Sequence, residues 1–220
     1  MKYIKNLLLS LKEIFFVMIC QYLILIITLW VLGIDKSLIW ATIFLSLFQL
    51  LFSILKLHKK EIIYHKNSYF PYLLLGVSIS TIYNMIILGL GKGFIPTEKV
   101  NILLVIISSG IIGPIFEEVI FRYVLINKLK NFNSTKTTIL LSAIIFGLFH
   151  NNLITVIYAI VIGIINALLY IKKKSLLPSI LVHISANMMT QLLFDYNFFI
   201  LILGCILFLL SLLIIKREEH

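Results

Sequence analysis

Four polar side chains lie in stretches of the sequence that are otherwise apolar, and their types suit the activation of water. They are Glu117, His150, His183 and Asn187. A carboxylate and an imidazole that face one water molecule can polarise it for attack on a carbonyl carbon. Imidazole and carboxamide N–H groups can donate hydrogen bonds to the oxyanion that forms. This set therefore predicts hydrolysis of amide bonds, with Glu117 as the general base and His150 orienting the water and shuttling protons.

Helical spacing predicts which polar residues share a face. Three pairs are four positions apart and so lie on one helix face: Glu118 with Arg122, Phe146 with His150, and His183 with Asn187. Glu118 and Arg122 can therefore form an ion pair, whereas Glu117 points about 100° away from Glu118. A charge within a membrane costs several kcal/mol unless it is paired or faces water. We expect Glu117 to face a hydrated cavity.

Zinc chemistry is an alternative that the spacing leaves open. Glu117, His150 and His183 are all residue types that bind zinc. The local H-E-x-x-H signature of zinc proteases is absent, so spacing does not decide between a metal ion and a bare water molecule. Both possibilities stay open on the residues alone.

The chain that must position these residues is too apolar for a soluble fold. Hydrophobic residues make up 61% of its 220 residues and charged residues 13%, against about 25% charged in soluble domains. A soluble globular protein, a disordered chain and a coiled coil are excluded, because none could keep so much apolar surface from water. The strands of an outer-membrane barrel would alternate rather than run continuously apolar. The predicted fold class is therefore all-α, a polytopic helical membrane protein.

Eight apolar runs can be placed as membrane spans. They are residues 13–34, 37–57, 69–90, 100–129, 137–150, 153–171, 176–194 and 198–215. Fifteen of the 19 lysine and arginine residues lie in the terminal segments, in alternate loops or at the span ends next to them; the exceptions are Lys36, Lys92, Lys99 and, within a span, Arg122. Positive residues favour the cytoplasmic side, so both termini are predicted to be cytoplasmic. The net charge of +10 then indicates orientation and lipid contact, and no nucleic-acid partner is expected.

The candidate residues are expected at comparable depths. Counting from the inner ends of their spans at about 1.5 Å per residue, Glu117, His150 and Asn187 lie roughly 16 to 20 Å deep and His183 roughly 10 Å. Pro114 has no N–H to donate, so the helix should kink about one turn before Glu117. One cavity could therefore hold all four side chains.

Three short motifs, taken together, resemble those of the CPBP family, which comprises CAAX proteases and bacteriocin-processing enzymes and is also called Abi. Residues 117–122 (EEVIFR) resemble its EExxxR motif, residues 146–150 (FGLFH) its FxxxH motif and residues 183–187 (HISAN) its HxxxN motif. The ordered set covers roughly residues 100–194. One departure is Tyr123, where many relatives have glycine after the arginine.

The resemblance implies an intramembrane endopeptidase similar to the type II CAAX prenyl protease, with about eight transmembrane helices and a conical catalytic cavity. It assigns Glu117 and His150 to water activation, His183 and Asn187 to oxyanion contacts, and Glu118, Arg122 and Phe146 to supporting positions. It divides the chain into N-terminal helices and basic loops (1–98), a catalytic core (99–195) and a C-terminal helix with a basic tail (196–220). The implied partners are a hydrophobic peptide or membrane-protein substrate and the lipid bilayer. The resemblance also implies water activation by glutamate without a metal ion, so we favour bare water over zinc and expect no metal and no other cofactor.

The substrate and the biological role are left open by the sequence. Frequent Ile, Lys and Asn indicate an AT-rich bacterial genome, and the resemblance there implies bacteriocin maturation, self-immunity or membrane-protein regulation. Two other functions remain as alternatives. One is a non-catalytic bacteriocin-immunity membrane protein that keeps the motifs, and the other is a proton-coupled transporter, because buried Glu and His also build proton relays.

Overall fold

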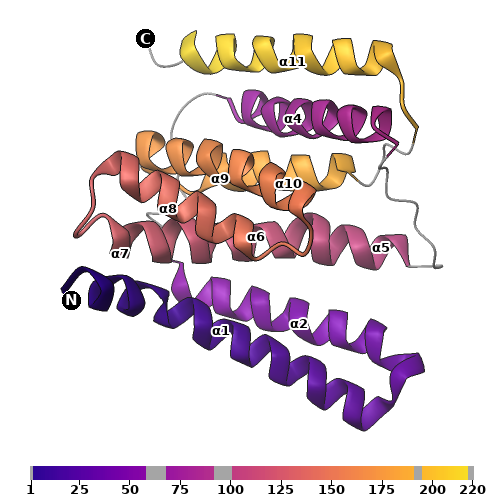
Figure 1. Ribbon diagram of the computed structural model, residues 1–220. Coiled ribbons are helices and arrows are strands. Elements are labelled where there is room, and N and C mark those ends of the chain that lie inside the picture. The colour runs from indigo at the N-terminus through magenta and orange to yellow at the C-terminus, as the bar shows by residue number, and fades with distance from the viewer. Residues whose placement is uncertain (1, 58–67, 92–100, 191–194, 218–220) are drawn as a thin grey trace. The chain divides into compact units, whose positions relative to one another are not determined.

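The secondary structure of the described residues is helical throughout, which confirms the all-α prediction. The computed structural model describes residues 2–57, 68–91, 101–190 and 195–217 (Figure 1). These ranges contain no strand, and six of their helices are long and apolar enough to cross a membrane. The protein is therefore an all-α polytopic membrane protein.

Each predicted span corresponds to a helical stretch in the described residues. They are α1 (Lys2–Leu32), α2 (Ile34–Lys56), α4 (Phe70–Gly89), Ile102–Leu129, α8 (Thr135–Leu148), α9 (Leu153–Lys173), α10 (Leu177–Thr190) and α11 (Phe198–Arg217). The stretch Ile102–Leu129 consists of α5 (Ile102–Val105), the π-helical segment η1 (Ile106–Ile112), α6 (Gly113–Glu118), the π-helical segment η2 (Val119–Ile126) and α7 (Asn127–Leu129). Helices α8 and α10 have 14 residues each, fewer than the roughly 20 that span a bilayer without tilt.

The first helix begins earlier than its apolar run predicts. The run indicates a span from residue 13, whereas α1 begins at Lys2. The residues before Glu13 are rich in leucine and lysine, which are good helix formers, and contain no glycine or proline. The helix therefore extends beyond the apolar run. The thickness of the membrane sets the length of the apolar run, whereas backbone propensity decides where the helix begins.

Part of the charge pattern lies outside the described residues. The basic residues and histidines outside the described ranges are His58, Lys59, Lys60, His65, Lys66, Lys92, Lys99 and His220. The cytoplasmic position of both termini stays a prediction.

The chain folds into two compact units, and each unit combines two separate stretches of sequence. The first unit contains Met1–His58 and Ile115–Ala167, and the second contains Lys59–Pro114 and Leu168–His220. The predicted division into N-terminal helices (1–98), a catalytic core (99–195) and a C-terminal helix (196–220) is a division by function, and it stays a prediction.

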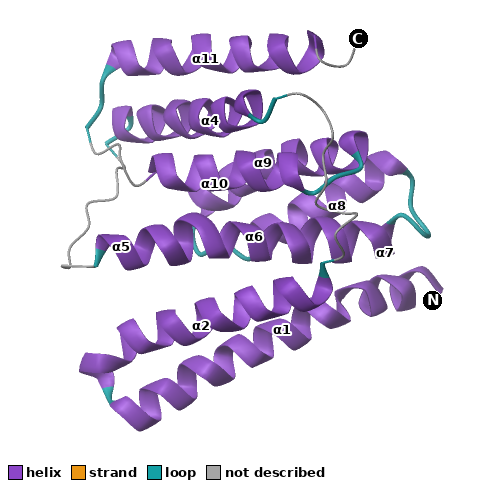
Figure 2. Cartoon of the chain, turned by 180° about the vertical axis from the view of Figure 1, so that it is seen from behind, coloured by secondary structure: helices purple, strands orange, loops and turns teal. Residues whose placement is uncertain are grey.

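Helices α1 and α2 form an antiparallel hairpin in the first unit (Figure 2). Gly33 connects them with a φ of 71°, a backbone conformation that favours glycine. Far from this turn, the Glu13 carboxylate binds Lys56 of α2 at 2.8 Å and Lys128 of α7 at 2.9 Å. Glu13 therefore ties the hairpin to the stretch of chain that carries Glu117.

Helices α8 and α9 complete the first unit. The Phe121 ring of η2 meets the rings of Phe146 and Phe149 edge-on, at centroid distances of 5.1 and 5.3 Å. Helix α9 approaches α8 at Gly163, where an added Cβ would lie 3.1 Å from the Cα of Ala143. The aromatic contacts fix α8 against η2, and the glycine allows α9 to pack closely on α8.

In the second unit, α4 lies between α10 and α11 (Figure 1). Glycine allows close approach on both of its sides. Gly76 of α4 lies directly against Val182 and Ser185 of α10, and a Cβ added to Gly204 of α11 would lie 3.0 Å from the Cγ2 of Thr81. Small residues of this kind let helix backbones pack closely in a membrane.

Replacing Gly76 by alanine is expected to destabilise the protein by about 1–3 kcal/mol, since the added methyl group would overlap the Val182 carbonyl and the Ser185 hydroxyl. The measurement is the thermal unfolding midpoint of the purified protein in detergent micelles. Gly110→Ala is the matched control, because its Cβ would meet only the Met188 Cγ at 3.5 Å, an ordinary contact. Equal midpoints for the Gly76 variant and the unmodified protein would contradict the close packing described here.

Candidate active site

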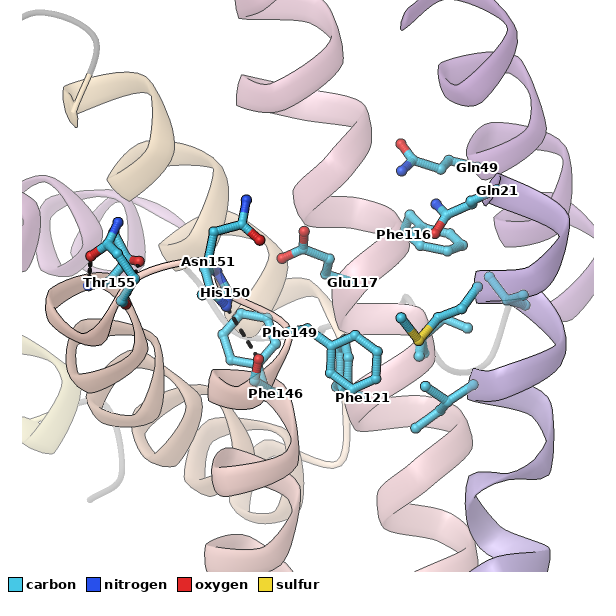
Figure 3. A pocket seen from close by; sticks show the side chains of 15 residues that line it. Gln21, Gln49, Phe116, Glu117, Phe121, Phe146, Phe149, His150, Asn151 and Thr155 are labelled. Carbon is cyan, nitrogen blue, oxygen red and sulfur yellow. Dashed lines mark hydrogen bonds between the residues drawn. The ribbon is translucent and has the colours of Figure 1, made fainter. Parts of the chain in front are cut away.

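A cavity of about 450 Å³ lies in the first unit and contains the side chains of Glu117 and His150. Its lining comes from α1, α2, α6, η2, the end of α8, the turn that follows it and the start of α9 (Figure 3). Aromatic rings form much of the wall: Phe116, Phe121, Phe146 and Phe149. The polar groups in the lining are Gln21, Gln49, Glu117, His150, Asn151, Asn152 and Thr155. A mostly apolar cavity with a few convergent polar groups is typical of a binding or catalytic site.

Glu117 and Glu118 are adjacent but have different environments. Glu117 is half-buried, and its carboxylate points into the cavity toward the turn that holds His150 and Asn151 (Figure 3). Glu118 is fully buried and binds Arg122. The predicted rotation between the two carboxylates is therefore present in the structure.

One nitrogen of the His150 ring is held by α8, the helix that ends two residues before it. His150 Nδ1 lies 3.2 Å from the carbonyl oxygen of Phe146. A carbonyl oxygen only accepts hydrogen bonds, so Nδ1 must carry the proton in this contact. In the neutral ring Nε2 then has a lone pair, which allows it to accept a hydrogen bond or a proton from water.

Behind the cavity, a buried polar network connects three helical stretches. Glu118 accepts hydrogen bonds from Arg122 Nε at 3.0 Å and from Asn166 Nδ2 at 2.9 Å. Arg122 Nη1 donates to Ser142 Oγ at 3.1 Å, and this hydroxyl donates to the Phe121 carbonyl at 3.0 Å. Glu118, Arg122, Ser142 and Asn166 all have 0% exposure. The network therefore holds the Glu117 turn against α8, which ends two residues before His150, and against α9.

Phe146 lies between this network and His150. Its ring centroid is 5.0 Å from the Arg122 guanidinium carbon and 5.0 Å from the His150 ring centroid, the latter in an edge-on contact. The arginine over the ring is a cation–π arrangement. Phe146 thus restricts the imidazole on one side while its own carbonyl orients Nδ1.

His183 and Asn187 belong to the second unit. His183 is 3% exposed, and Asn187 Nδ2 donates a hydrogen bond to the Ser109 carbonyl at 3.0 Å. Ser109 lies in η1, where the wider π-helical turn changes the usual pairing of backbone carbonyls. The amide of Asn187 has a second N–H. The oxyanion role of both residues stays a prediction.

The motifs fall within a segment that matches a known family. Residues 99–189, about two fifths of the chain, match the family model described as "Type II CAAX prenyl endopeptidase Rce1-like". This segment is similar to the Rce1-like family. All of Glu117, Glu118, Arg122, Phe146, His150, His183 and Asn187 lie within it.

A curated relative agrees with this assignment. The chain is 34% identical over 84 residues to a Bacillus subtilis (strain 168) protein with the name "Putative membrane peptidase YdiL". The match covers 38% of this chain and about a third, 34%, of that relative's length. No solved structure matches the chain significantly.

Two residues of the buried network in the Rce1-like segment are absent from the sequence prediction. Ser142 carries a signal that would have revealed it, because it precedes Phe146 by four residues and His150 by eight and so continues their helix face. Asn166 is an isolated carboxamide in the apolar run 153–171, which indicates a polar partner within the bundle. Its bond to Glu118 identifies that partner.

The side chains around the cavity offer few metal ligands. Within the described residues of the first unit, no three His, Cys, Asp or Glu side chains form a group that would hold a metal ion. Structural zinc sites have four protein ligands and catalytic sites three. Glu117 and His150 would supply two, so the donor set of the first unit fits zinc poorly.

Proposed function

We propose that this protein is an intramembrane endopeptidase that cleaves a hydrophobic or membrane-anchored peptide with a water molecule activated by Glu117 and His150. The observation that carries the proposal is the presence of both side chains on one cavity of mixed aromatic and polar lining. The match of residues 99–189 to the Rce1-like family supports the same activity.

Glu117 would act as the general base. Its carboxylate takes a proton from the water as the oxygen attacks the peptide carbonyl carbon, and the C=O electrons move to the carbonyl oxygen. The proton then passes to the leaving nitrogen as the C–N bond breaks, either from Glu117 or through Nε2 of His150. The Phe146 carbonyl keeps Nδ1 of His150 protonated, so Nε2 is the nitrogen that exchanges protons.

His183 and Asn187 would stabilise the oxyanion in this proposal. Each offers an N–H donor, and a lost oxyanion donor typically lowers kcat by about 10²- to 10³-fold. Glu118, Arg122 and Phe146 would act indirectly, by holding the Glu117 and His150 turns. We further propose that both termini face the cytoplasm of a bacterial cell, as the distribution of lysine and arginine indicates.

The test uses purified full-length protein in detergent micelles and a library of quenched hydrophobic peptides, with products identified by mass spectrometry. The proposal expects cleavage of at least one peptide, called the reporter peptide below, and no cleavage by His150→Ala. Wild-type protein that cleaves no peptide in the library, or a His150 variant with undiminished rate, would count against the proposal. Comparison of peptide termini from cells with the active protein and with the variant would then identify the natural substrate and distinguish maturation from regulation.

The same variants separate the alternatives. Proton flux in liposomes without proteolysis would favour a transporter. Bacteriocin immunity that survives both Glu117→Gln and His150→Ala would favour a non-catalytic immunity protein.

Cleavage of the reporter peptide is expected to continue in the presence of a zinc chelator, with a rate within about twofold of the untreated protein. The reason is the small set of metal ligands at the cavity, since a zinc site needs at least three protein ligands. The measurement is the initial rate after dialysis against the chelator. A complete loss of activity that added zinc restores would show that a metal takes part.

A further inference from the structure

Two glutamines of the α1–α2 hairpin lie on the cavity that holds Glu117. Gln21 comes from α1 and Gln49 from α2, and both are half-buried. Figure 3 shows their carboxamides on the other side of Glu117 from His150 and Asn151. The proposed mechanism assigns no role to either glutamine.

These carboxamides differ from the other polar groups of the hairpin. The hydroxyls of Thr28 and Ser53 donate to carbonyls of their own helices, at 2.6 Å and 2.8 Å. By contrast, the side-chain carboxamides of Gln21 and Gln49 make no hydrogen bond within the described part of the chain. A carboxamide in an apolar span is unfavourable unless it is hydrogen-bonded or meets water. The position of both on the cavity wall suggests that their partner is a bound molecule.

We propose that Gln21 and Gln49 bind the main chain of the substrate peptide and hold it across the cavity in front of Glu117. This inference rests on the proposed peptidase function. The two residues would be substrate-binding contacts and not catalytic ones, since they lie on the wall away from His150 and carry no group that can take up a proton during the reaction.

The chemistry of the cavity favours main-chain recognition over side-chain recognition. A carboxamide has one acceptor and two donors, and so matches the N–H and C=O of a peptide group. The wall beside the glutamines is aromatic and would accommodate apolar side chains. A hydrophobic peptide brings almost no polar groups other than its peptide groups, and these need partners once they leave water. Two carboxamides from neighbouring helices can supply such partners along an extended segment.

The test is the kinetics of Gln21→Leu and Gln49→Leu with the reporter peptide. Each substitution is expected to raise KM at least about fivefold and to leave kcat within about twofold, because a contact made equally in the ground state and the transition state changes binding alone. The matched controls are Tyr22→Phe on α1 and Thr42→Val on α2. Tyr22 is 61% exposed, and the Thr42 hydroxyl bonds to the Leu38 carbonyl of its own helix. Both controls should keep the wild-type KM.

A second set of peptides tests main-chain binding directly. Reporter peptides methylated on one backbone nitrogen at a time lose one N–H donor each. At one or two positions methylation is expected to raise KM of the wild-type protein, and at these positions the leucine variants should show no further increase.

Each outcome decides between the proposals. Unchanged KM in both leucine variants, with cleavage intact, would overturn the role of the glutamines and leave the peptidase function standing. Raised KM with full sensitivity to every methylation would indicate side-chain contacts and overturn main-chain binding. A loss of kcat in the leucine variants and also in Gln21→Met and Gln49→Met, which keep the side-chain length, would indicate a structural role. A wild-type protein without peptidase activity would overturn both proposals.

Discussion

Glu117→Gln is expected to lower kcat for the reporter peptide by at least about a hundredfold, the range for loss of a general base. Glutamine keeps the shape of the side chain and one of its oxygen acceptors, but it does not take a proton from water. The loss should therefore fall on kcat, with KM within a few-fold of wild type. Steady-state kinetics of the purified protein over a range of reporter-peptide concentrations measures both constants.

The thermal unfolding midpoint controls for folding in this experiment. Because Glu117 is half-buried and faces the cavity, its replacement should leave the midpoint within about 2 °C of the wild-type value, as for surface substitutions of small effect. A folded Glu117→Gln variant that retains a tenth or more of the wild-type kcat would contradict the role of Glu117 as general base. Transport or binding would then be the better account of the cavity.

Glu118→Leu is expected to destabilise the protein by about 3–5 kcal/mol. This is the usual cost of removing one partner of a buried ion pair, because the other charge is then buried without compensation. Glu118 and Arg122 have no exposure to solvent, and Glu118 also accepts from Asn166 at 2.9 Å. Its removal leaves the Arg122 guanidinium buried without its carboxylate. The first measurement is the free energy of unfolding, from equilibrium unfolding of the purified protein in mixed micelles. The second is the thermal unfolding midpoint.

A double-mutant cycle separates the charge effect from loss of packing. Glu118→Leu/Arg122→Leu should be more stable than Glu118→Leu alone, because the double variant leaves no buried charge unpaired. Glu13→Leu is the matched control: its ion pairs with Lys56 and Lys128 join side chains that are about one-third exposed, and such pairs contribute about 0–1 kcal/mol each. Equal losses for Glu13→Leu and Glu118→Leu would contradict the distinction between an exposed and a buried pair.

The amino-acid sequence by itself determined the class of fold and the local geometry of the motifs. A chain with 61% hydrophobic residues must bury them in lipid or protein, so the helical membrane fold followed from composition. The face shared by Glu118 and Arg122 followed from helical periodicity, and the structure confirms it with a bond of 3.0 Å. The divergence of Glu117 from Glu118 followed from the same periodicity. Such relations depend on neighbours within two turns of one helix, and sequence spacing describes these directly.

Only the tertiary structure decided which distant side chains meet. Asn166 is 48 positions from Glu118, and their contact depends on the packing of α9 against α8 and η2. Gln21 and Gln49 reach the cavity because the hairpin brings α1 and α2 beside the Glu117 turn. The π-helical turns on both sides of α6 also change the direction of side chains relative to a regular helix. Helical period predicts a face of one helix, whereas the partner of that face depends on how several helices pack, and this is a property of the whole fold.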